Sequence, residues 1–154
     1  MSVVIIEVQS EIEMKRLGER LGRLLEGGEI IELVGDVGAG KTTLTKGVAL
    51  GLAIDEDVQS PSFTISRVYD AREGLVLAHY DFYRLADPGI MADELYETVH
   101  DPKSVTIIEW AEIVGGVLPD DRLTVAITSP TETMRSIRIT SGGPRSATLL
   151  EKLT

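Results

Sequence analysis

Eight consecutive residues near the start of the chain have the types and spacing that suit a polyphosphate. Residues 35–42 read Gly-Asp-Val-Gly-Ala-Gly-Lys-Thr and fit the pattern G-x-x-x-x-G-K-[ST] at each fixed position. Glycines let the backbone curl so that its N–H groups point at phosphate oxygens, and a helix that starts at the lysine adds the positive end of its dipole. The predicted nucleotide-binding residues are Gly35, Asp36, Val37, Gly38, Ala39, Gly40, Lys41, Thr42 and Thr43.

Three side chains of this loop have distinct expected roles. Lys41 should reach the β- and γ-phosphates, and the hydroxyl of Thr42 should ligate Mg²⁺. Thr43 is a plausible donor to the α-phosphate. No Asn-Lys-x-Asp or Thr-Lys-x-Asp stretch is present to read guanine. The predicted ligands are therefore ATP or ADP with Mg²⁺.

Two further segments place carboxylates at the ends of predicted strands. Residues 105–108 are apolar or β-branched and lead into Glu109, which is the form of a Walker B strand with Glu in place of the commoner Asp. Residues 79–85 read His-Tyr-Asp-Phe-Tyr-Arg-Leu and set Asp81 among aromatic residues. His79 is interpreted as structural, because the sequence shows no partner for it.

Four blocks, in this order, resemble the TsaE family, also called YjeE, small bacterial ATPases that support formation of threonylcarbamoyladenosine in tRNA. The blocks are residues 35–43, Ser60-Pro61-Ser62-Phe63-Thr64, residues 79–85, and Ile108-Glu109-Trp110-Ala111-Glu112. The resemblance spans about residues 10–128. Met14 departs from it, because many members carry a threonine in that region, and no family pattern is apparent after Ser129.

The resemblance implies roles for particular residues. Thr42 and Glu109 would be magnesium ligands, and Asp81 would contact the metal or its waters. Thr64 stands where the family has a switch-like threonine near the γ-phosphate, and Trp110 where it has a tryptophan beside the nucleotide. The family also implies TsaB and TsaD as partners, with tRNA involved only indirectly.

Hydrophobic spacing predicts the elements that position these motifs. Apolar residues at helical spacing and a capping box from Ser10 to Glu13 indicate a first helix, whose apolar positions are Ile12, Leu17, Leu21, Leu24 and Leu25. Helices are expected over residues 11–26, 41–50, 91–99 and after Pro144, and strands over residues 1–7, 29–34, 63–69, 75–80, 104–110, 122–128 and 134–140. This order predicts a three-layer α/β P-loop fold around a mixed, mostly parallel sheet.

Composition narrows the functional class. The net charge of −10 argues against broad electrostatic binding to nucleic acid or anionic membranes. The absence of cysteine excludes disulfides and thiolate metal sites and favours a cytoplasmic location. A length of 154 residues, with no stretch long enough to span a membrane, favours one soluble domain over residues 1–154.

The predicted reaction is hydrolysis of ATP to ADP and phosphate, with Lys41, Asp81, Glu109 and Thr64 as catalytic candidates. It should be slow without partners, because only Arg67 and Arg84 lie near these motifs in sequence and acids of the strongly anionic surface are alternative partners for both. A small P-loop kinase and a nucleotide-gated binding module stay as alternatives. The sequence leaves open which carboxylate orders the attacking water, the source of a catalytic arginine, and the oligomeric state.

Overall fold

The fold is built on one seven-stranded sheet with the order β1-β7-β6-β2-β5-β4-β3. The computed structural model describes residues 2–36, 38–61, 65–83, 85, 87 and 89–154. The strands are β1 (Val3–Val8), β2 (Ile30–Val34), β3 (Ser66–Asp70), β4 (Val76–Asp81), β5 (Ser104–Glu109), β6 (Leu123–Thr128) and β7 (Arg135–Ser141). The four central strands, β6, β2, β5 and β4, run parallel, and both edges are antiparallel.

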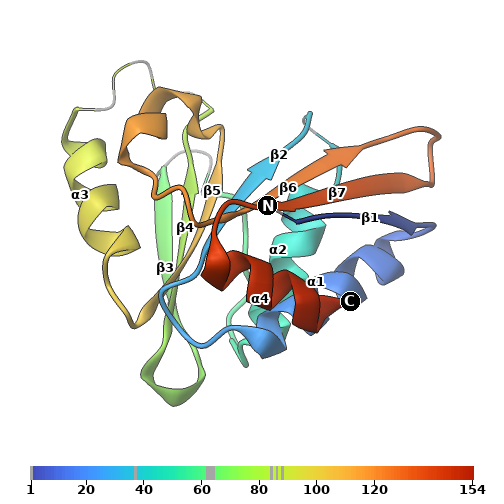
Figure 1. Ribbon diagram of the computed structural model, residues 1–154, viewed down its shortest axis with the longest axis horizontal. Helices are drawn as coiled ribbons and strands as arrows, with labels where there is room; N and C mark the ends of the chain where they lie inside the picture. Colours follow the sequence, from blue (N-terminus) through green and yellow to red (C-terminus); the bar gives the residue numbers. More distant parts are fainter. Residues whose placement is uncertain (1, 37, 62–64, 84, 86, 88) are drawn as a thin grey trace.

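Helices cover the sheet on both sides (Figure 1), as the predicted three-layer architecture requires. They are α1 (Glu11–Leu24), α2 (Lys41–Gly51), α3 (Gly89–Val99) and α4 (Pro144–Leu153), with short 3₁₀ turns η1 (Arg72–Gly74) and η2 (Ala111–Val117). One core lies between the sheet and α1, α2 and α4, and the other lies under α3 and η2. The predicted elements are all present, with ends displaced by a few residues. Among the described helices, none is long and apolar enough to cross a membrane.

The parallel register brings the candidate site residues to one edge of the sheet. Asp81 at the end of β4 pairs in register with Glu109 at the end of β5, and Glu109 pairs with Leu33 near the end of β2. The residues that follow β2 form the glycine-rich loop. Because parallel strands present their carboxyl ends on the same side, both carboxylates lie beside that loop.

Glycines let α1 and α2 approach very closely. Gly18 and Gly22 of α1 face Gly47 and Gly51 of α2, and a Cβ atom at any of these positions would collide with the backbone of the opposite helix. The contact holds the start of α1 next to the glycine-rich loop. Ile12 is an exception to the predicted apolar face of α1, because its side chain is 65% exposed. It lies in the first turn of the helix.

Candidate functional site

The glycine-rich loop connects β2 to α2 through left-handed backbone conformations. Gly35, Gly38 and Gly40 have φ angles of 155°, 84° and 113°, which side chains with a Cβ rarely tolerate. Gly40 is the N-cap residue of α2 and has no side chain with which to cap the first turn. The first N–H groups of the helix are thus free of a local side-chain acceptor, an arrangement that suits an anion.

Lys41 is a buried cation surrounded by electron-rich groups. Its Nζ atom donates a hydrogen bond of 2.7 Å to the carbonyl oxygen of Gly35 and lies 3.8 Å from Oε1 of Glu109. The same atom lies 4.4 Å from the centre of the Trp110 ring. Only 6% of Lys41 is exposed. The lysine is therefore held directly beneath the loop.

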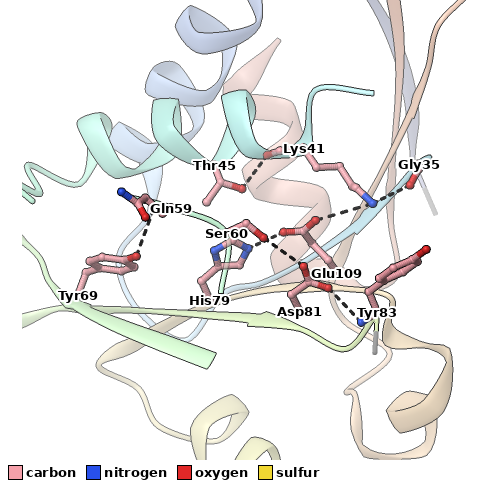
Figure 2. Close-up of polar contacts among 10 residues, drawn as sticks. All are labelled: Gly35, Lys41, Thr45, Gln59, Ser60, Tyr69, His79, Asp81, Tyr83 and Glu109. Atoms are coloured by element: carbon pink, nitrogen blue, oxygen red, sulfur yellow. Dashed lines mark hydrogen bonds and ion pairs between the residues drawn. The ribbon is translucent and has the colours of Figure 1, made fainter. Parts of the chain in front are cut away.

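Glu109 connects Lys41 to a second buried residue. Its Oε2 atom lies 2.7 Å from Nε2 of His79, and Figure 2 shows the resulting chain from His79 through Glu109 and Lys41 to Gly35. His79 is fully buried and Glu109 is 4% exposed. Sequence reasoning found no partner for His79 because its partner lies 30 residues further along the chain, on the neighbouring strand.

Asp81 is oriented by groups on both sides of it. Its Oδ2 atom accepts a hydrogen bond of 3.2 Å from the hydroxyl of Ser60, and Oδ1 accepts one of 3.0 Å from the backbone N–H of Tyr83. The ring of Tyr83 packs on that of Trp110 with centroids 4.9 Å apart. Hydrogen bonds from neighbouring groups therefore orient both carboxylates.

The loop forms the floor of a cavity of about 820 Å³. On one side is the carboxylate wall, defined here as Ser60, Asp81, Tyr83, Glu109 and Trp110. On the other side is the far wall, which combines the start of α1 with the β6–β7 loop and consists of Gln9, Ser10, Glu11, Ile12, Met14, Glu132, Thr133 and Arg135. The volume is ample for a small-molecule ligand.

The oxygen donors in this cavity fit a magnesium ion that arrives with phosphates. Thr42, Asp81 and Glu109 all line the cavity. Within the described ranges, no three His, Cys, Asp or Glu side chains gather closely enough to hold a metal ion by themselves. Mg²⁺ characteristically uses one or two carboxylates together with substrate phosphates and waters, so the donor set matches its usual coordination.

The eight predicted loop residues that the structure describes divide into two groups. Gly38, Gly40, Lys41, Thr42 and Thr43 line the cavity. Gly35, Asp36 and Ala39 act through their backbones instead, since each offers its carbonyl oxygen to a hydrogen bond within the site region.

Val37, Thr64 and Arg84 lie outside the described residues. Arg67, on the edge strand β3, is exposed.

The sequence analysis missed the far wall. Arg135 at the start of β7 donates from Nε to the carbonyl oxygen of Ala39 at 3.2 Å, although 96 residues separate them. Its Nη1 atom donates to carbonyl oxygens of Thr131, Glu132 and Met134. Met14, where a nucleotide contact is in doubt from sequence, packs against Gly40 and lines the cavity. No local sequence signal marks these residues, because their place in the site follows from the order of strands.

Comparison with known proteins gives a consistent result. The family model described as threonylcarbamoyl adenosine biosynthesis protein TsaE matches residues 8–137. That match extends past residue 128, where the pattern read from sequence ended, and it includes Arg135.

Two relatives, from Streptomyces coelicolor and Bacillus subtilis, are both named tRNA threonylcarbamoyladenosine biosynthesis protein TsaE. The first is 38% identical over 140 residues, which is 88% of this chain and 95% of the relative. The second is 36% identical over 145 residues, which is 92% of this chain and 88% of the relative. The crystal structure of YdiB from Bacillus subtilis matches with a TM-score of 0.81 and 33% identity, covering 99% of this chain and 94% of that one.

Proposed function

This chain belongs to the TsaE family of threonylcarbamoyl adenosine biosynthesis proteins, and we propose that it binds ATP with Mg²⁺ in the cavity above the glycine-rich loop and hydrolyses it slowly. The observation that carries the proposal is the meeting of Lys41 and Glu109 beneath the loop at 3.8 Å. A phosphate-binding cation and a metal-side carboxylate are the two groups that phosphoryl transfer on such a loop requires.

The two helix N-termini at the cavity support one orientation of the nucleotide. The first turn of α1 is already capped, because Ser10 accepts a hydrogen bond from the N–H of Glu13, and it carries Glu11 and Glu13. The first turn of α2 has neither a side-chain cap nor an acidic residue. Phosphates therefore favour α2. The base and ribose would extend toward the far wall, where Ile12 and Met14 offer apolar contacts.

In the proposed reaction, the protein orients the phosphates and stabilises their developing charge. Lys41 would exchange the carbonyl of Gly35 for the β- and γ-phosphates, while loop N–H groups hold the remaining oxygens. When bound, Mg²⁺ would supply positive charge that neutralises the transferring phosphates. Thr42, Asp81 and Glu109 would hold the metal and its waters, and one of the two carboxylates would order the attacking water.

We expect a partner to accelerate the reaction. Among the arginines that the structure describes, Arg135 lines the cavity, but it already donates to four backbone carbonyls. Its guanidinium binds backbone carbonyls of both the glycine-rich loop and the β6–β7 loop. An arginine at the γ-phosphate, worth roughly 10³- to 10⁵-fold in rate, would then be supplied by Arg84, which lies outside the described residues, or by a partner. On family grounds the proposed partners are TsaB and TsaD.

The test follows phosphate release and threonylcarbamoyladenosine formation together with purified components. Wild-type protein alone should release phosphate slowly, and TsaB with TsaD should accelerate it. Lys41→Ala should abolish the acceleration, whereas Lys46→Ala, a lysine of the same helix outside the cavity lining, should behave as wild type. Fast turnover without partners, or many cycles of modification with Lys41→Ala, would contradict the proposal.

A further inference from the structure

His79 is a buried histidine that does not reach the cavity. It is fully buried, while Glu109 in front of it lines the cavity. Packing alone does not account for an imidazole at this position. Leu77, two residues earlier on the same face of β4, fills the core with carbon atoms only. His79 instead leaves its Nδ1 atom buried with no hydrogen-bond partner among the described residues.

The useful atom of the ring is Nε2. An ionised carboxylate only accepts hydrogen bonds, so the 2.7 Å contact assigns a proton to Nε2, which donates to Oε2 of Glu109. With a proton on Nε2 the ring makes this bond, and Nδ1 has no hydrogen-bond partner among the described residues. One buried nitrogen is therefore left unsatisfied while the other is engaged at short range.

This bond gives the two carboxylate oxygens of Glu109 different surroundings. The terminal torsion of a glutamate is broad and roughly two-fold, so an unheld carboxylate can rotate between its faces. With Oε2 held from behind by His79, Oε1 is the oxygen directed toward Lys41, 3.8 Å away, in the part of the cavity expected to hold metal and phosphate. The parallel pairing of β4 and β5 fixes both backbones, which makes the arrangement rigid.

We propose that His79 is a positioning residue: its Nε2–H holds one oxygen of Glu109 so that the other is presented to Mg²⁺ and its waters when nucleotide binds. The inference rests on the proposed function, since it assigns Glu109 to the metal. Residues that hydrogen-bond a ligating carboxylate fix its orientation, and their loss typically lowers metal affinity or activity about 10- to 100-fold. His79 would thus act on the metal through Glu109 without touching it.

The test compares two amides that differ in reach. In His79→Gln the side-chain nitrogen lies the same number of bonds from the backbone as Nε2, whereas in His79→Asn it ends at the position of Nδ1 and falls short of Glu109. Binding of ADP and of a non-hydrolysable ATP analogue, with and without Mg²⁺, is followed by the fluorescence of Trp110, the one tryptophan of the chain. His100→Gln, at the other, exposed histidine, is the control.

His79→Asn should lose about 10- to 100-fold of the affinity that Mg²⁺ adds, with metal-free ADP binding unchanged. His79→Gln should recover most of that loss, and His100→Gln should match wild type. Adding His79→Asn to Glu109→Gln should cost much less than His79→Asn alone, because both act on one interaction.

Two outcomes would overturn the inference. One is that Mg²⁺ raises the nucleotide affinity of His79→Asn as much as it raises that of the wild-type protein. The other is that His79→Asn and His79→Gln lose metal-free nucleotide binding and thermal stability to the same extent. That result would indicate that His79 contributes only to packing. If the wild-type protein gains no affinity from Mg²⁺, the proposed function itself fails, which is a separate result.

Discussion

The two walls of the cavity use different kinds of structure to hold their polar groups. On the carboxylate wall, Glu109 of β5 contacts side chains from two other elements: His79 of β4, which lies behind it, and Lys41 at the start of α2. On the far wall, polar side chains satisfy the backbone: Ser10 caps α1, and Arg135 binds carbonyls of two loops.

The difference suggests a division of labour. Side chains paired across a hydrogen-bonded ladder are held in position, which suits groups that must meet a metal and a transferring phosphate. Side chains that cap a helix or bind a loop shape the cavity and steady its floor. If so, changes on the carboxylate wall should depend on Mg²⁺ and affect the rate, whereas changes on the far wall should affect nucleotide affinity with or without metal.

The largest effect is expected at Lys41, which lies between the two walls. Lys41→Ala removes the cation aimed at the β- and γ-phosphates and should cost roughly 2 to 4 kcal/mol of transition-state stabilisation. Single-turnover phosphate release measures this directly. Lys46→Ala provides the matched control. Wild-type turnover in Lys41→Ala would show that the loop does not perform the proposed chemistry.

The next effect separates the carboxylates. Glu109→Gln should weaken magnesium-dependent nucleotide binding by about 10- to 100-fold and leave metal-free ADP binding largely intact, because it removes charge from the metal side. Asp81→Asn should lower the rate more than the affinity. Titration of both variants with and without Mg²⁺ measures this. Equal losses in metal-free binding would indicate a structural role for the carboxylate wall.

A smaller effect is expected on the far wall. Arg135→Ala removes the hydrogen bond to the carbonyl of Ala39 and should weaken nucleotide binding by about 1 kcal/mol, roughly five-fold, equally with and without Mg²⁺. Calorimetric titration of both metal states checks the prediction. Arg138→Ala, an exposed arginine of the same strand, is the control. A loss confined to the magnesium state would erase the distinction between the walls.

The smallest effect on the site is expected at Asp121, which lies outside both walls and caps α4. Burial alone would raise the pKa of Asp121, but hydrogen bonds from Ser146 and from the N–H of Arg145 outweigh it and hold the pKa below the ordinary value of 3.8. Because the pKa of Asp121 is lower in the folded protein, its ionised carboxylate stabilises the fold at pH values above 3.8. This stabilisation disappears as the pH falls through the pKa of the folded state.

Asp121→Asn should therefore cost about 1 kcal/mol of stability at pH 7 and progressively less as the medium becomes acid. Thermal unfolding across pH measures the effect. Nucleotide binding should not change, and a change in magnesium dependence would mean that stability and site function are not separable here.

Much of the fold and one wall of the site could be predicted from sequence, since their signals are local. The spacing from Gly35 to Thr42 is the spacing that a backbone turn around a phosphate requires, and the apolar run before Glu109 identifies a central strand. The order of helices and strands follows from periodicity over about ten residues. Roles of individual site residues, and the single-domain organisation of residues 1–154, stay predictions.

Only the tertiary structure decided which distant residues meet. His79 finds Glu109 because β4 and β5 pair in parallel register, and Arg135 reaches Ala39 because β6 lies between β7 and β2. Helix α1 approaches α2 closely because glycines of the two helices face each other. By itself the sequence determined the loop, its helix and the acidic strand end, because neighbouring residues alone impose those conformations. Strand order and register determined the rest, since pairing depends on the whole core being buried at once.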